Sequence, residues 1–240
     1  MESKGWSTTI YTWSELESAA ERQSLFVQHL KRDSVILKDA DDRLRHILAV
    51  SDQRSSYAWE RKQAMTLFSA IECIPDAPWG GIWALDIAYV AFRSFAVAFL
   101  ADENLVTFSM SEIIPQMCRC GLLRPEDSKC LLELRAWKKG YRDGGRESPP
   151  ISKTLKLLDT VDRRLKAGIH IHRTDPETFS SWAISEIRKG SHWYRSARLW
   201  EAFLELNDTS DSSKILGMLR MPQIYGRSLR HHLDYLAVAA

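Results

Sequence analysis

The sequence has no excess of one charge and no patterned pair of cysteines. It carries 33 basic and 31 acidic residues among 240, so its formal charge of +2 neither requires nor excludes a polyanionic partner. Its four cysteines form no Cys-x-x-Cys pair, and nothing at the N-terminus resembles a secretory signal. These absences indicate a cytoplasmic protein with reduced thiols.

The sequence also lacks an uninterrupted apolar run as long as a membrane span, which needs about 20 residues. Its densest apolar stretch, residues 82–101, is broken by Asp86 and Arg93. Apolar residues there recur every third or fourth position and cover more than one face. We therefore expect a buried helix at the centre of a bundle and no membrane contact.

Turn and capping residues divide the rest of the chain into further helices. Ser14 with Glu17, and Ser109 with Glu112, have the spacing of capping boxes. Pro125 suits the first turn of a helix that we expect over residues 126–141. Asp175 and Pro176, residues typical of an N-cap and a first turn, predict another helix start.

One short strand is expected near the N-terminus. Residues 6–13 are rich in β-branched and aromatic side chains, which favour strands. The sequence therefore predicts a mainly α fold with a short N-terminal strand and an additional C-terminal helical region.

Several segments occur in an order typical of a known superfamily. They read Ala-Tyr-Val-Ala-Phe-Arg at 88–93, Phe-Ser-Met-Ser-Glu-Ile-Ile at 108–114, Cys-Gly-Leu-Leu-Arg-Pro-Glu-Asp at 120–127 and Leu-Leu-Glu-Leu-Arg at 131–135. In order and spacing they resemble the HEPN superfamily of four- or five-helix bundles. This resemblance covers about residues 54–167.

The segment before the bundle resembles the end of a minimal nucleotidyltransferase domain. The similar stretches are 10–16, 25–30 and 35–39. In such proteins a final strand and helix lead directly into a HEPN-like bundle. We therefore expect a nucleotidyltransferase-like remnant over 1–50, a HEPN-like bundle over 51–168 and a C-terminal helical extension over 169–240.

The catalytic motif of those nucleotidyltransferases is not found here. It is a Gly-Ser pair followed by two aspartates, which hold magnesium against the triphosphate. Nothing before Trp6 has this pattern. We expect no nucleotide transfer by this chain and no cofactor; the chain is a remnant or the partner of a separate nucleotidyltransferase chain.

The catalytic motif of HEPN ribonucleases is also altered. It consists of an arginine, four to six residues and a histidine, whose implied roles are phosphate stabilisation and proton transfer. Here Arg135 is followed by Tyr141, and an unperturbed tyrosine titrates near ~10. A second Arg-x4-His pattern, Arg227 to His232, lies near the C-terminus. These two pairs are the catalytic candidates if a ribonuclease activity remains.

Basic and aromatic residues are interleaved in two regions, a pattern suited to phosphates and stacked bases. The nucleic-acid candidates are Lys138, Lys139, Arg142, Arg188, Lys189, Trp193, Tyr194, Arg195 and Arg230. For Trp182, Trp200 and Phe203 we favour the alternative that they belong to the core while the neighbouring arginines face solvent. Trp193 and Tyr194 follow Gly190-Ser191 at a helix start, so they are the better candidates for an exposed patch. Cys118 and Cys120 are too close in sequence for a usual structural zinc site, so we expect no metal.

The first functional hypothesis is a non-catalytic HEPN-like protein that binds nucleic acid, such as RNA, or a protein partner. The resemblance implies a toxin–antitoxin or anti-phage defence setting and a homodimer. Two alternatives remain open: a metal-independent ribonuclease, and a pure assembly subunit of a larger complex.

Overall fold

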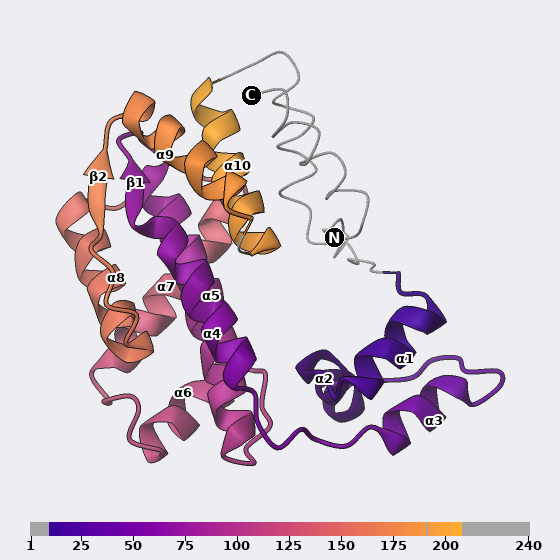
Figure 1. Ribbon diagram of the computed structural model, residues 1–240. Helices are drawn as coiled ribbons and strands as arrows, with labels where there is room; N and C mark the ends of the chain where they lie inside the picture. The colour runs from indigo at the N-terminus through magenta and orange to yellow at the C-terminus, as the bar shows by residue number, and fades with distance from the viewer. Residues whose placement is uncertain (1–9, 191, 208–240) are drawn as a thin grey trace, which may run out of the picture.

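A computed structural model describes residues 10–190 and 192–207 of the chain (Figure 1). Within these residues the fold is mainly helical, as predicted, with ten α-helices, a 3-10 turn at Ser69–Ile71 and two short strands. The elements are α1 Trp13–Glu21, α2 Leu25–Asp33, α3 Arg43–Val50, α4 Ala58–Phe68, β1 Cys73–Pro75, α5 Gly80–Asp102, α6 Met110–Arg119, α7 Asp127–Arg142, α8 Ile151–Leu165, β2 His172–Thr174, α9 Pro176–Arg188 and α10 Trp193–Asn207. Arg227, Arg230 and His232 lie outside the described residues.

Helix α5 is the centre of the bundle, as its apolar pattern predicts. It packs against α4, α6, α7 and α8, and Figure 1 shows it running along the length of the bundle. It is the one helix of the described part that is long and apolar enough to cross a membrane, but 72% of its apolar window is buried inside the protein. The other helices therefore supply the apolar surroundings of α5.

Two glycines allow the start of α5 to pack closely. A Cβ added at Gly80 would lie 2.1 Å from the backbone oxygen of Pro75, and one added at Gly81 would lie 2.9 Å from Cβ of Ser148. Both distances are shorter than van der Waals contact. The first turn of α5 can therefore approach Pro75 and Ser148 this closely only without side chains at these positions.

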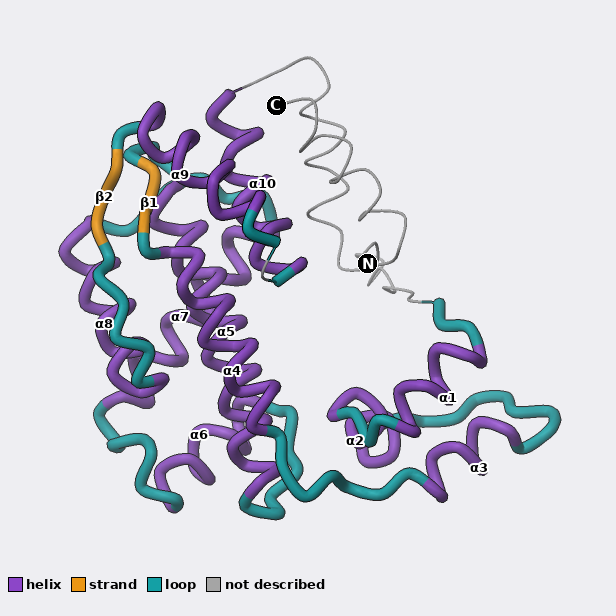
Figure 2. Tube along the Cα trace, viewed as in Figure 1, coloured by secondary structure: helices purple, strands orange, loops and turns teal. Residues whose placement is uncertain are grey.

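The two strands are not where the sequence predicted a strand. Residues 6–9 of the expected N-terminal strand lie outside the described residues, residues 10–12 are irregular, and α1 begins at Trp13. Instead β1 and β2 form a parallel pair in which Cys73 is opposite His172, close to α9 (Figure 2). The pairing depends on a contact across 99 positions of sequence, which local propensity does not encode.

Both predicted capping boxes are wrong. The first lies two residues earlier, where the Thr12 hydroxyl accepts from the Glu15 amide and the Glu15 carboxylate accepts from the Thr12 amide. At the second, Ser109 is the N-cap but makes no side-chain cap. The Glu112 carboxylate is instead bound by the Thr107 hydroxyl and by Arg32 of α2, which joins the N-terminal helices to the bundle.

The C-terminal helices α9 and α10 pack on the same core as α5. The Trp83 and Phe179 rings meet edge to face, with centroids 5.9 Å apart. Trp200 is buried, and Trp182 and Phe203 are partly buried against the core, as expected. The expectation that the neighbouring arginines face solvent is wrong for Arg195 and Arg198, because both are buried in ion pairs.

Candidate nucleic-acid interface on helix α7

Helix α7 carries four of the predicted site residues together with Tyr141, and it packs along α5. The buried side of α7 includes Leu131, Leu134 and Tyr141, whereas Arg135 and Lys139 are exposed. The helix therefore separates the predicted residues into a buried set and a solvent-facing set.

The buried set belongs to an ion network that joins α5, α7 and α10. Asp86 of α5 has no exposed surface. Arg142 donates from Nε and Nη2 to its two oxygens at 3.0 and 2.8 Å, and Arg198 of α10 donates to it at 2.6 Å. Arg198 also donates to Glu201. Two arginines and two acids thus neutralise one another inside the protein.

The network fixes the charge of both arginines. Burial acts to lower the pKa of Arg198, but the adjacent Glu201 and Asp86 carboxylates outweigh it and raise that pKa well above its usual value. Burial and the nearby Arg198 also act to lower the pKa of Arg142, but the Asp86 carboxylate outweighs them and raises that pKa above its usual value. Arg142, predicted as a phosphate ligand, therefore has its charge compensated by Asp86.

Tyr141 is held in the same network. Its hydroxyl donates to Glu201 Oε1 at 2.5 Å, and the Arg198 guanidinium carbon lies 5.5 Å from its ring centroid. Arg135 and Tyr141 are six residues apart, which places them about 120° apart around the helix. Arg135 is exposed and Tyr141 is 4% exposed, so the helix does not bring this pair together at one site.

The other three cations form a basic strip, which we define as the exposed Arg135 and Lys139 together with the half-buried Lys138. Arg135 and Lys139 are one turn apart and share a face. Lys138 lies beside them, with its Nζ 5.9 Å from the Tyr89 ring centroid. No carboxylate of the described residues is within ion-pair distance of these three cations. The strip therefore presents uncompensated positive charge.

A cavity of about 490 Å³ lies next to the basic strip. Ala136, Trp137 and Gly140 of α7 line one side, and Arg146 and Glu147 of the following loop line the other. The Ala136–Gly140 row is adjacent to the Arg135–Lys139 row on the helix surface. Trp137 is half-buried and donates to Glu133 at 3.3 Å. The cation nearest its ring is Lys153 of α8, which pairs with Glu133 and whose Nζ lies 5.8 Å from the ring centroid, whereas Arg135 and Lys139 lie about 200° away around α7.

The predicted candidates on α9 and α10 are dispersed. Arg188 and Lys189 are exposed at the end of α9, and Lys189 pairs with Glu186. Arg195 is buried, donating to Glu186 at 2.8 Å and to the Ser69 hydroxyl at 3.1 Å. Its guanidinium therefore stabilises the packing of α10 on the bundle, and it is not available at the surface.

Trp193 and Tyr194 lie in a different place. They line a cavity of about 520 Å³, which we call the aromatic groove, between α2, α4, α5 and the start of α10. The expected exposed patch at these two residues is thus part of a groove that also includes Phe26, Trp59 and Phe108. Among the described residues, none lines both the aromatic groove and the cavity next to the basic strip.

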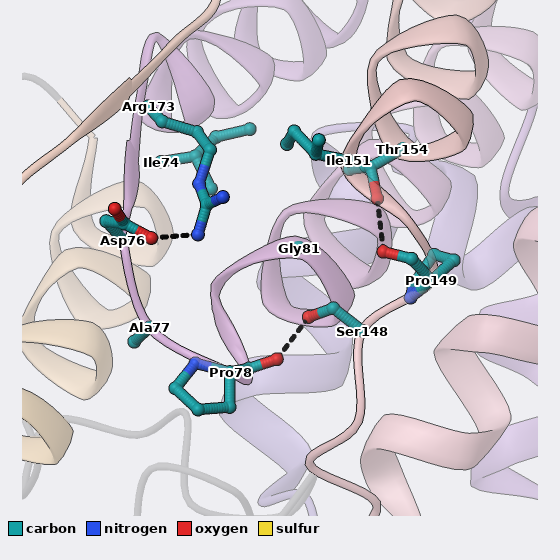
Figure 3. Close-up of a pocket in the computed structure, with 10 residues that line it drawn as sticks. All are labelled: Ile74, Asp76, Ala77, Pro78, Gly81, Ser148, Pro149, Ile151, Thr154 and Arg173. Carbon is teal, nitrogen blue, oxygen red and sulfur yellow. Dashed lines mark hydrogen bonds and ion pairs between the residues drawn. The ribbon is translucent and has the colours of Figure 1, made fainter.

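A third cavity, of about 320 Å³, lies at the start of α5 (Figure 3). Figure 3 shows that its polar groups bind one another: Arg173 pairs with Asp76, and the Ser148 hydroxyl donates to the Pro78 oxygen at 2.6 Å. The Thr154 hydroxyl donates to the Pro149 oxygen at 3.4 Å. These contacts hold the loops around α5 and leave little polar capacity for a ligand.

Sequence reasoning missed the acidic members of the ion network and Trp137, which lines the cavity of about 490 Å³. Asp86 interrupts an apolar run, and a lone carboxylate inside such a run signals a buried ion pair. Glu201 has no comparable local signal. Trp137 stands between basic residues at 135–139, a pattern that would have found it.

Among the described residues, no three His, Cys, Asp or Glu side chains form a group that suits a metal ion. Comparisons with protein-family models, with curated proteins and with solved structures found no match. The likeness to HEPN bundles therefore stays a prediction from the sequence.

Proposed function

We propose that this chain is a non-catalytic HEPN-like protein that binds RNA along the basic strip of α7. The observation that carries the proposal is the set of three cations at 135, 138 and 139 without carboxylate partners in the described part. Cations of this kind neutralise phosphates, whereas an ion-paired arginine such as Arg142 already has its anion. A toxin–antitoxin or defence setting, implied by the HEPN resemblance, is part of the proposal.

The absence of catalysis is supported by Tyr141. Its hydroxyl is bound to Glu201 inside the protein, on a different side of α7 from Arg135, so it is poorly placed to transfer a proton to a phosphate held by Arg135.

Fluorescence anisotropy with a labelled single-stranded RNA tests the binding. We expect the affinity to fall as salt rises, because each phosphate contact releases counterions. The Arg135→Gln/Lys139→Gln double variant should bind more weakly and show a salt slope smaller by about 1.4, since each contact to a single strand contributes about 0.7.

Lys62→Gln is the matched control, because Lys62 is an exposed cation on α4. It should leave both affinity and slope unchanged. Equal binding by the wild type and the double variant at low salt, or no RNA binding at all, would remove the basis of the proposal.

A further inference from the structure

The aromatic groove has a wall composition unlike the basic strip. Five aromatic side chains line it: Phe26, Trp59, Phe108, Trp193 and Tyr194. Trp59 is 63% exposed and Trp193 is 37% exposed, so two tryptophans stand at its opening. Leu25 of α2 and aliphatic residues of α4 and α5 add apolar surface. The polar residues of the lining are His29, Glu60, Gln63, Arg93, Ser94 and His192. A concave site of this volume with mostly apolar walls matches the usual features of small-ligand sites.

One cation lies in this apolar lining without a counterion. Arg93 of α5 donates from Nη2 to the Phe108 oxygen at 2.9 Å, and no carboxylate of the described residues pairs with it. The groove's own acid, Glu60, is occupied by Arg54 at 3.0 and 3.3 Å. Because a guanidinium has five N–H donors in a fork, most of those of Arg93 remain for a planar anion.

His192 supplies a second polar group. Its Nδ1 accepts from the Arg195 amide at 3.1 Å. Burial and the nearby Arg195 lower its pKa, so the imidazole is neutral at pH 7. A neutral imidazole that accepts at Nδ1 carries its proton on Nε2. The groove therefore contains a hydrogen-bond donor besides Arg93, and no unoccupied acid opposes a negative ligand.

We propose that the aromatic groove binds a small amphipathic anion: an apolar body of drug size that carries one carboxylate- or sulfonate-like group paired with Arg93. The apolar walls account for the body and the uncompensated guanidinium for the charged end. A nucleic-acid strand suits the groove less well, because several phosphates need several free cations. This site is separate from the basic strip, and the inference does not depend on RNA binding.

Two probes with the same aromatic body test the charge requirement. They are 8-anilinonaphthalene-1-sulfonate and its uncharged analogue N-phenyl-1-naphthylamine, titrated into the full chain and followed by fluorescence. We expect one sulfonate probe per chain, bound more tightly than the neutral one. Arg93→Gln should weaken the sulfonate probe about tenfold, as expected for a charged hydrogen bond, and change the neutral probe less than about twofold.

Three further variants keep the test independent of folding. Arg93→Lys should recover part of the sulfonate affinity, because it keeps the charge without the fork. Trp59→Ala should weaken both probes, because exposed Trp59 forms a wall and not the core. Arg135→Gln, on the basic strip, should weaken neither.

Equal affinity of the two probes, or no effect of Arg93→Gln on the sulfonate, would overturn the proposal. The proposal would also be overturned if Trp59→Ala left the binding of both probes unchanged. The same holds if single-stranded RNA displaced the sulfonate probe at one-to-one stoichiometry. RNA binding by the Arg135→Gln/Lys139→Gln variant tests the basic strip of α7 alone, so its result neither supports nor opposes anion binding in the aromatic groove.

Discussion

At the scale of single residues, the central feature is that α7 places similar side chains in opposite roles. Arg142 and Arg135 are both arginines of one helix, but Arg142 is bound to buried Asp86 and Arg135 faces solvent without a carboxylate partner in the described part. The two arginines are seven residues apart and share a helix face, so the difference arises from their position along α7: Arg142, in the last turn, reaches Asp86 of α5, and Arg135 lies two turns earlier. Arg142 therefore contributes to stability, and Arg135 is the one that we propose contacts RNA.

The buried ion network makes a strong prediction about Glu201. Glu201→Gln removes the charge that balances Arg198 while keeping the side-chain size, so it leaves a buried cation only partly compensated. We expect the free energy of unfolding to fall by about 3 kcal/mol or more in urea titrations.

Glu205→Gln is the matched control on the same helix. Its partner Arg146 and Glu205 itself are partly solvent-exposed, so its loss should cost no more than about 1 kcal/mol. Similar effects of the two substitutions would show that the Glu201 network contributes little to stability.

A pH effect is predicted at His192. Its pKa in the folded protein lies below its ordinary value of 6.5, because burial and Arg195 disfavour the charged ring. The unfolded chain therefore takes up a proton first as pH falls below 6.5. His192 contributes stability that is complete above this pH and is lost as pH falls toward the folded pKa.

Urea titrations between pH 5 and pH 8 measure this contribution as a difference between two proteins. The wild type should lose more stability than His192→Gln as pH falls from 7 to 5, since glutamine keeps an acceptor but does not titrate. Parallel pH curves for the two proteins would contradict the predicted shift.

At the scale of elements, sequence reasoning succeeded where the signal is local. The predicted cap at Asp175 is confirmed, because its carboxylate accepts from the Thr178 amide at 2.9 Å and Pro176 begins α9. The apolar period of α5 and the extent of α7 were also predictable. The parallel strands were not, because the paired residues Cys73 and His172 are 99 positions apart in the sequence.

In the candidate site, too, the features with a local sequence signal were predictable and those that depend on distant residues were not. Exposure of Trp193 could be predicted from its place at a helix start, and the cations at 135 and 139 from their spacing. That Arg195 and Arg198 are buried could not, because their partners Glu186 and Asp86 lie on other helices. Long-range ion pairs have no periodic signature in one sequence.

Two glycines in different helices give a test of the packing around α5. Gly80→Ala should destabilise the protein by about 1–3 kcal/mol, because its Cβ would collide with the Pro75 backbone oxygen. Gly140→Ala should stabilise it by about 0.5–1 kcal/mol, because its Cβ meets only Ile82 at 4.0 Å and alanine favours the helix. Thermal unfolding of both variants checks the pair, and the same sign for both would contradict the described packing.

At the scale of the whole molecule, the C-terminal helices complete the core that the bundle begins. Strand β2 pairs with β1, and the Asp86–Arg198 contact joins α10 to α5. The HEPN resemblance further predicts a homodimer. Sedimentation equilibrium should give twice the mass of one chain, whereas a single-chain mass at micromolar concentration would contradict it.

The central claim is that the chain holds RNA along α7 without cutting it. The most direct measurement is a gel that follows one labelled single-stranded RNA, with and without chelator, for both retention and cleavage. We predict retained RNA of full length, and loss of retention in the Arg135→Gln/Lys139→Gln variant. Shortened RNA that disappears with Arg135→Ala would contradict the account, because it would make α7 part of a working ribonuclease.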